Sequence, residues 1–144
     1  LTAVYFGVPV VFAKKSAGSN MDKEMFATEV MSYTHNRKNH VVVSKKYLKP
    51  GEHILIMDDF LANGCAVSGL LDLVKQADGI VEGIGICIEK GFQGGGDALR
   101  EAGYDVRSLA VIKRMGKYLS AKRCLSVSST FLPCLWQISR RSLS

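Results

Sequence analysis

The sequence predicts an α/β protein in which a parallel, twisted sheet is flanked by helices. Three apolar segments have strand character, at residues 53–57, 80–88 and 104–112. Helical patterns at 66–77 and 97–103 separate them, and this alternation favours parallel pairing with right-handed connections. The middle segment is apolar almost without interruption, which is typical of a strand buried on both faces.

The part of the chain before residue 53 is less regular. Residues 4–13 contain a β-branched run suited to a buried strand, and Lys14 and Lys15 follow at its carboxyl end. Residues 16–40 are polar and include a Gly-Ser-Asn sequence, so we expect a loop there. Residues 41–43 are three valines and predict a short strand.

The two predicted helices differ in strength. The first has apolar residues at i, i+3, i+4 and i+7, and it ends at the Ala-Asp-Gly sequence of residues 77–79. Its apolar face consists of Val67, Leu70, Leu71 and Val74. The second helix is short, with Asp97 near its start and Gly103 at its end. We expect the three glycines at 94–96 to form a flexible break before it.

Composition indicates one folded core and a separate tail. The chain has 144 residues, 47% of them hydrophobic, which is enough for a single core. Residues 1–105 contain 11 of the 19 Lys and Arg and all 13 Asp and Glu, so the remaining 8 basic residues lie in the last 39. We expect a core at 1–114 and a divergent, basic, Ser-rich and poorly ordered tail at 115–144. Because the excess positive charge lies in the tail, the net charge of +6 does not indicate nucleic-acid binding.

The sequence also bounds the cellular setting. No apolar run approaches the roughly 18 residues of a membrane-spanning helix and no secretory leader opens the chain, so we expect a cytoplasmic protein without a membrane partner. The chain begins at Leu1 and not at Met, and we expect a fragment. The cysteines form neither a CxxC pair nor a zinc-ligand spacing with His, and we expect incidental thiols at Cys65, Cys87, Cys124 and Cys134.

The strongest chemical signal follows the strand at 53–57. Asp58 and Asp59 lie at the edge where open α/β sheets bind ligands. Two adjacent carboxylates there require compensation, which sugar hydroxyl groups or a Mg²⁺ ion supply. The small residues of 62–66 allow a loop whose backbone N–H groups, with the start of the next helix, form a cradle for a phosphate. This spacing fits one ribose 5-phosphate, and the alternative is a tight turn with two solvated Asp side chains.

This segment resembles the phosphoribosyl pyrophosphate (PRPP) signature of the type I phosphoribosyltransferases, in which two acids and a small-residue loop follow an apolar strand. Residues 8–15, 58–64 and 83–93 resemble that family in its order and spacing, and the resemblance extends from residue 1 to about residue 114. The Ala-Asn-Gly loop is specific, and it is most similar to that of bacterial members that use xanthine.

The resemblance implies a role for each matching residue. Asp58 and Asp59 would be the catalytic pair that holds the ribose 2′- and 3′-hydroxyl groups, and Lys90 would bind the exocyclic oxygen of the purine. Lys14 and Lys15 would lie on the pyrophosphate side. An alternative remains for each of these lysines. Lys14 and Lys15 are also consistent with an exposed basic pair without a ligand, and Lys90 taken alone is also consistent with a solvated lysine at a strand end. The 5′-phosphate would be bound, largely through backbone N–H groups, by Ala62, Asn63, Gly64, Cys65 and Ala66.

The reaction implied is purine salvage, in which the 5-phosphoribosyl group of PRPP is transferred to xanthine, giving xanthosine 5′-monophosphate (XMP) and pyrophosphate. The resemblance also implies Mg²⁺ as a cofactor that arrives with PRPP, no metal site of the chain's own, a homodimer, and no nucleic-acid partner. The family's N-terminal hood and acidic Ser-Gly loop would precede the position of Leu1, so we expect the sugar-phosphate half of an enzyme. Two alternatives remain, a PRPP-sensing effector domain of the purine-repressor type without catalysis, and an inactive truncated product.

Overall fold

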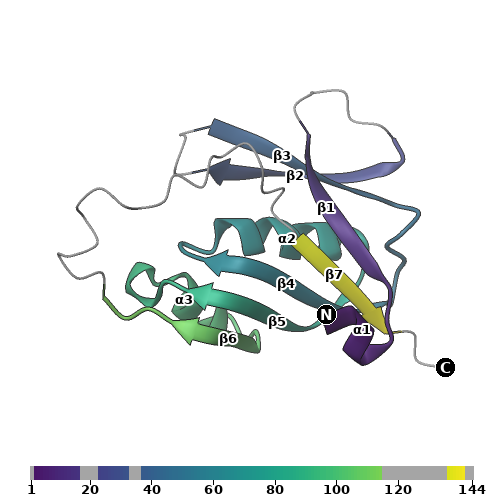
Figure 1. Cartoon of the computed structure of the whole chain (residues 1–144). Helices are drawn as coiled ribbons and strands as arrows, with labels where there is room; N and C mark the ends of the chain where they lie inside the picture. Colours follow the sequence, from purple (N-terminus) through teal and green to yellow (C-terminus); the bar gives the residue numbers. More distant parts are fainter. Residues whose placement is uncertain (1, 17–22, 33–36, 115–135, 142–144) are drawn as a thin grey trace.

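The computed structural model describes residues 2–16, 23–32, 37–114 and 136–141, and these form one mixed sheet with helices packed on it (Figure 1). Within this part of the chain, the strands lie in the order β2-β3-β1-β7-β4-β5-β6. The elements are α1 (Thr2–Phe6), β1 (Val10–Ser16), β2 (Met25–Ser32), β3 (Arg37–Ser44), β4 (His53–Leu61), α2 (Cys65–Gln76), β5 (Ile80–Glu89), η1 (Gly91–Gln93), α3 (Gly95–Glu101), β6 (Val106–Val111) and β7 (Trp136–Arg141).

The predicted α/β architecture is confirmed in the half of the sheet that follows β4. Strands β4, β5 and β6 pair in parallel, with α2 and α3 as the connections between them. The prediction that β5 is buried on both faces is wrong. Ile84 and Ile86 are buried, whereas Cys87, which follows them and points to the other face of the strand, is exposed. Ile84 and Ile86 belong to the same buried cluster as the apolar side chains of α2.

Helix α2 lies between β4 and the hairpin of β2 and β3, so it buries more of its surface than one apolar stripe (Figure 1). Val67, Leu70 and Val74 are buried as predicted, and Leu73 joins them, whereas Leu71 is half-buried. On the hairpin side the contact is close: a Cβ atom added at Gly69 would lie 2.4 Å from Cγ2 of Val30. This core fixes α2, and with it the segment at its N-terminus, against the end of β4.

The strand predicted within residues 4–13 is present as β1, which begins at Val10 and continues to Ser16. Helix α1 precedes it and ends at Phe6, because Pro9 disfavours a helical conformation in the residue before it. The loop prediction for residues 16–40 is wrong. The expected loop at 16–40 contains β2 and the beginning of β3, which pair antiparallel from Met25↔Ser44 onward. These strands are stabilised by packing on α2, a contact that a polar sequence window does not reveal.

Strand β7 lies where the sequence predicted no element. It pairs antiparallel with both β1 and β4 and thereby joins the two halves of the sheet. The backbone of this strand therefore belongs to the same sheet as the core. The rest of the predicted tail, residues 115–135 and 142–144, lies outside the described residues, and so do Cys124 and Cys134.

The described part of the chain contains no helix that is both long enough and apolar enough to cross a membrane. Cys65 is half-buried and Cys87 is exposed, and both are free thiols.

Candidate active site

Both aspartates lie in β4, near its carboxyl end. The strand extends to Leu61, whereas the sequence predicted that it ends at Met57. Burial alternates along this strand, and Asp58 takes the buried position that follows Ile54 and Ile56. Its side chain is only 5% exposed, whereas Asp59 is half-buried. Asp58 Oδ1 accepts a hydrogen bond from the Asp59 N–H, with an N–O distance of 2.9 Å.

The second carboxylate oxygen of Asp58 is left without a protein partner. Among the described residues, Asp58 Oδ2 is the buried side-chain oxygen that accepts no hydrogen bond. Such an atom has a free-energy cost of about 1–3 kcal/mol, which a ligand hydroxyl group or a cation would remove. Asp58 Oδ2 therefore lacks a hydrogen-bond donor at the position where the sequence predicts a sugar.

The environment of Asp58 changes its acidity. Burial, together with the adjacent negative charge of Asp59, raises the pKa of Asp58 from 3.8 to about 7. The hydrogen bond from the Asp59 N–H and the positive charge of Lys15 act in the opposite direction. Strongly shifted carboxyl groups at a strand end are typical of functional sites.

The loop that follows β4 is shaped by backbone conformation. Gly64 is buried and has φ +83°, a left-handed conformation that residues with a side chain rarely adopt. It is the N-cap of α2 and provides no side-chain hydrogen bond to the helix, so the N–H groups of the first turn have no capping side chain. Cys65 and Ala66 begin the helix and are half-buried, and Asn63 is exposed. The phosphate cradle predicted from the sequence therefore coincides with a helix start that has no side-chain cap, where backbone N–H groups can bind an anion.

Lys90 lies beside this end of β4. Its N–H donates to the Leu61 carbonyl oxygen at 2.8 Å, and its Nζ atom lies 5.8 Å from the centre of the Phe60 ring. Phe60 is 49% exposed and was not assigned to the site from the sequence. An exposed aromatic residue directly after an acidic pair is the signal that would have suggested it. The structure therefore brings the predicted purine-side lysine to the end of β4 that carries the acidic pair.

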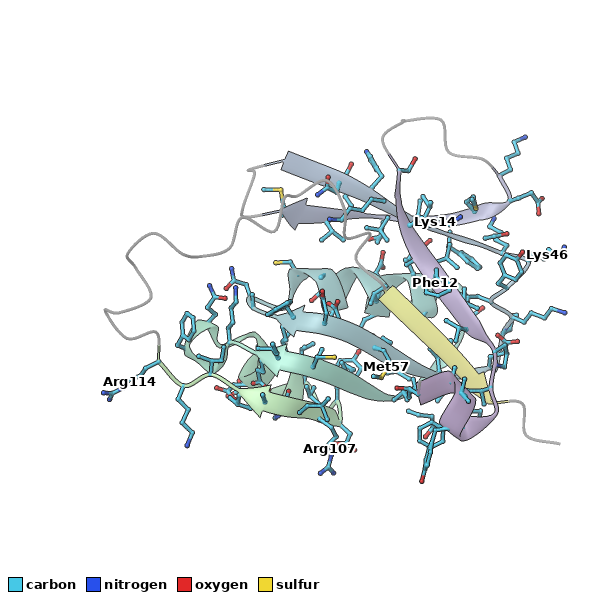
Figure 2. The ribbon with its side chains drawn as sticks, in the orientation of Figure 1. Phe12, Lys14, Lys46, Met57, Arg107 and Arg114 are labelled. Atoms are coloured by element: carbon cyan, nitrogen blue, oxygen red, sulfur yellow. The ribbon has the colours of Figure 1, made fainter. Side chains whose placement is uncertain are left out.

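The two N-terminal lysines lie at the same edge of the sheet. Because β1 and β4 are both antiparallel to β7, they run in the same direction, and their carboxyl ends flank the start of β7. Figure 2 labels Lys14 on β1 and Met57 on β4, on the two sides of β7. Both lysines are exposed, and the charge of Lys15 acts on Asp58. Lys15 is thus electrostatically coupled to Asp58.

A resident metal site is not evident in the described part of the chain, where no three His, Cys, Asp or Glu side chains gather. The two adjacent aspartates can supply part of a coordination shell, and the free Oδ2 atom of Asp58 suits a cation whose other ligands come from a bound phosphate compound.

Comparisons with known proteins identify named relatives of the chain. No protein-family model matches the chain. It is 60% identical over 108 residues to a xanthine phosphoribosyltransferase of Bifidobacterium animalis subsp. lactis, covering 75% of this chain and 56% of that protein. It is 56% identical over 115 residues to a xanthine phosphoribosyltransferase of Lachnoclostridium phytofermentans, covering 80% of this chain and 59% of that protein. The chain thus spans less than two thirds of the length of these curated relatives.

Solved structures show the same fold. Adenine phosphoribosyltransferase from Thermoanaerobacter pseudethanolicus superposes with a TM-score of 0.60 and 26% identity, covering 76% of this chain and 60% of that one. The adenine phosphoribosyltransferase of Trypanosoma brucei, solved with AMP, pyrophosphate and ribose-5-phosphate, superposes with a TM-score of 0.68 over 92% of this chain and 58% of that one. At 14% identity, the second similarity concerns the fold alone.

Proposed function

We propose that the chain is a member of the type I phosphoribosyltransferase family, to which its relatives and structural neighbours point, and that it forms the ribose-phosphate part of a site that transfers 5-phosphoribosyl from PRPP to xanthine. The products are XMP and pyrophosphate, and the process is purine salvage. The observation that carries the proposal is the buried Asp58 Oδ2 atom without a partner, next to a glycine-capped helix start. A ribose 5-phosphate supplies the two groups that this arrangement needs, hydroxyl donors and an anion.

Each part of the site has a distinct task in this proposal. Asp58 and Asp59 accept hydrogen bonds from the ribose 2′- and 3′-hydroxyl groups and orient the sugar. The backbone of residues 62–66 binds the 5′-phosphate at the start of α2. Lys90, held beside Phe60, offers a positive charge to the exocyclic oxygen of the purine. These contacts fix the anomeric carbon between the purine and the pyrophosphate, which is the main contribution of positioning to catalysis.

The group transfer breaks the bond between the anomeric carbon and pyrophosphate and forms a bond from that carbon to a purine nitrogen, which gives up its proton. Pyrophosphate leaves with the bonding electron pair, and positive charge at Lys14 and Lys15 stabilises it. Mg²⁺, arriving with PRPP, supplies further charge neutralisation on the pyrophosphate. No residue is assigned as a general base. Action in the cytoplasm and as a homodimer are further parts of the proposal, supported by the similarity of the chain to that family.

The test is calorimetric titration of the purified chain with ribose 5-phosphate, and with PRPP in the presence of Mg²⁺. The double variant Asp58→Asn/Asp59→Asn should lose binding of both ligands, and Asp72→Asn, an exposed change on α2 that keeps an acceptor for Gln76, should bind as the original chain does. Equal binding by the original chain and the double variant would refute the proposed ribose site.

A second assay separates catalysis from binding. Xanthine is added with PRPP and Mg²⁺, and XMP is measured. Formation of XMP that the double variant does not show supports the transferase. PRPP binding without XMP formation would instead favour the effector-domain alternative or a piece of the enzyme that is not competent alone.

A further inference from the structure

We infer that helix α3, together with the ion pair between its Arg100 and the buried Glu89, positions the phosphate loop. Gly95, Gly96, Glu89 and Arg100 are then positioning residues for the ribose-phosphate site. This inference rests on the proposed function, because it assigns to that site a support that lies outside residues 58–66. The evidence is a chain of contacts from the loop backbone to Gly95, from α3 to Glu89, and from Glu89 back to the strand end that carries Lys90.

The first contact is between two backbones. The Gly95 N–H donates to the Ala62 carbonyl oxygen at 3.2 Å. A Cβ atom at Gly95 would lie 2.2 Å from that oxygen and 2.6 Å from Asn63 C and Gly64 N. These are loop backbone atoms, so they cannot make room by changing a rotamer. The glycines at 94–96 are therefore not the flexible break that the sequence suggested, because Gly95 and Gly96 are buried and begin α3.

The second contact holds α3 in place. This helix has only seven residues, no side-chain cap, and Leu99 as its buried apolar side chain. Arg100 reaches from its last turn to Glu89 with two hydrogen bonds, Nη1 to Oε1 at 2.9 Å and Nη2 to Oε2 at 2.7 Å. The Glu89 side chain is 3% exposed, and Ser108 on β6 donates to its Oε2 atom. The first turn of α3 also lies against this carboxylate, since a Cβ atom at Gly96 would be 2.0 Å from Oε1.

The third contact connects Glu89 to the residues at the proposed substrate side. Glu89 is the last residue of β5 and immediately precedes Lys90, whose N–H is bonded to Leu61 at the start of the loop. The ion pair is therefore linked to the predicted phosphate loop through α3 and to the predicted purine-side lysine through the backbone of Glu89. A bidentate arginine–carboxylate pair fixes orientation as well as distance, which is the property that a support of this kind requires.

The test uses the whole chain, whose 15.7 kDa suits amide NMR, and ribose 5-phosphate as the probe. Arg100→Met removes the bidentate pair and should weaken ribose 5-phosphate binding about tenfold, the factor for losing one hydrogen bond to a charged group. Arg100→Lys should restore part of the affinity. Asp97→Asn is the matched control, since Asp97 touches Arg100 at 3.4 Å from an exposed position and does not contact Glu89 or the loop.

A steric pair of variants separates positioning from general stability. Gly95→Ala should weaken binding at least as much as Arg100→Met and shift the amide resonances of residues 62–65 in the unliganded chain. Gly79→Ala introduces a milder clash, 2.7 Å from the side-chain atom Cδ1 of Ile54, at the opposite end of the sheet. It should lower the melting temperature without changing ribose 5-phosphate affinity or those resonances.

The outcomes separate this inference from the proposed function. If the original chain binds ribose 5-phosphate and the Arg100 and Gly95 variants bind equally well, the positioning role is refuted and the proposed function stands. If the original chain does not bind the probe, the proposed ribose site fails, and the positioning role fails with it. Shifts at 62–65 in Arg100→Met, together with weaker binding and an unchanged Asp97→Asn, support the inference.

Discussion

Asp58→Asn should stabilise the unliganded chain, and by an amount that depends on pH. The pKa of Asp58 is about 7 in the folded state, whereas that of an unperturbed aspartate is 3.8. Below pH 3.8 the carboxyl group is protonated in both states and contributes no difference. As the pH rises from 3.8 to 7, the unfolded chain releases the proton while the folded chain retains it, so stability is lost over that interval.

The size of this loss follows from the shift. About three pKa units at about 1.4 kcal/mol per unit give a loss of stability of about 4 kcal/mol between pH 3.8 and pH 7. This is an upper value, because it applies no reduction for screening by solvent to a group with so little exposure. Asparagine has the shape of the protonated acid, keeps an acceptor for the Asp59 N–H, and carries no charge to bury. The stability difference between Asp58→Asn and the original chain should therefore be near zero at pH 3.5 and rise by about 1.4 kcal/mol per pH unit until about pH 7.

The assay is urea unfolding at half-unit steps from pH 3.5 to 8.5, with Asp72→Asn as the control at an exposed position. Taking the difference between variant and original chain removes the titration of groups that do not interact with Asp58. A difference that is independent of pH, or a loss of stability in Asp58→Asn at pH 8, would refute the argument that burial of this charge destabilises the empty site. A ribose ligand should reverse the preference, because it satisfies the carboxylate that Asn lacks.

Three other changes test separate parts of the structure. Glu89→Gln should lower the free energy of unfolding by about 2 kcal/mol at pH 7, the value of hydrogen bonds to a charged group. In the original chain, stability should fall as the pH drops below 4.5 toward the lowered folded-state pKa of Glu89, and urea unfolding should show that the variant lacks this loss. Gly69→Ala should destabilise the chain by about 1–3 kcal/mol through overpacking against β2, and Val30→Ala should relieve part of that cost in the double variant, measured by the same assay. Lys90→Met should lower the affinity for XMP about tenfold while leaving that for ribose 5-phosphate unchanged in calorimetry, and an equal loss for both ligands would contradict its purine-side role.

Local sequence patterns were sufficient for the half of the molecule that carries the site. The apolar residues of β4, the spacing of the α2 face and the acidic pair between them are all close in sequence, and hydrophobic periodicity reports such neighbours directly. The positions of Asp58 and of the loop at 62–66 at a strand end followed from the same pattern. Their agreement with the structure reflects a general rule, that parallel strands present their carboxyl ends at one edge.

The N-terminal half was less predictable for a physical reason. Residues 41–43 of β3 were predicted as a strand, whereas β2 and the first half of β3 lie in a segment polar enough to suggest a loop. They form a hairpin because Val30, Val41 and Val43 are buried in the core with α2. Strand β7 pairs with β1 and β4 although more than 70 residues separate it from either strand's own sequence. A window of neighbouring residues contains no record of such partners.

By itself, the sequence determined which residues could bind a sugar phosphate, because residue type and spacing along one strand, loop and helix are local properties. The tertiary structure decided how those residues are held. Burial leaves Asp58 Oδ2 without a partner and raises the pKa of its carboxyl group. Gly95 fits against the loop backbone from 33 positions beyond Ala62, and Arg100 binds Glu89 across 11 positions. Burial and close backbone contact arise only when separate segments pack together, and that packing gives the site its support and its electrostatics.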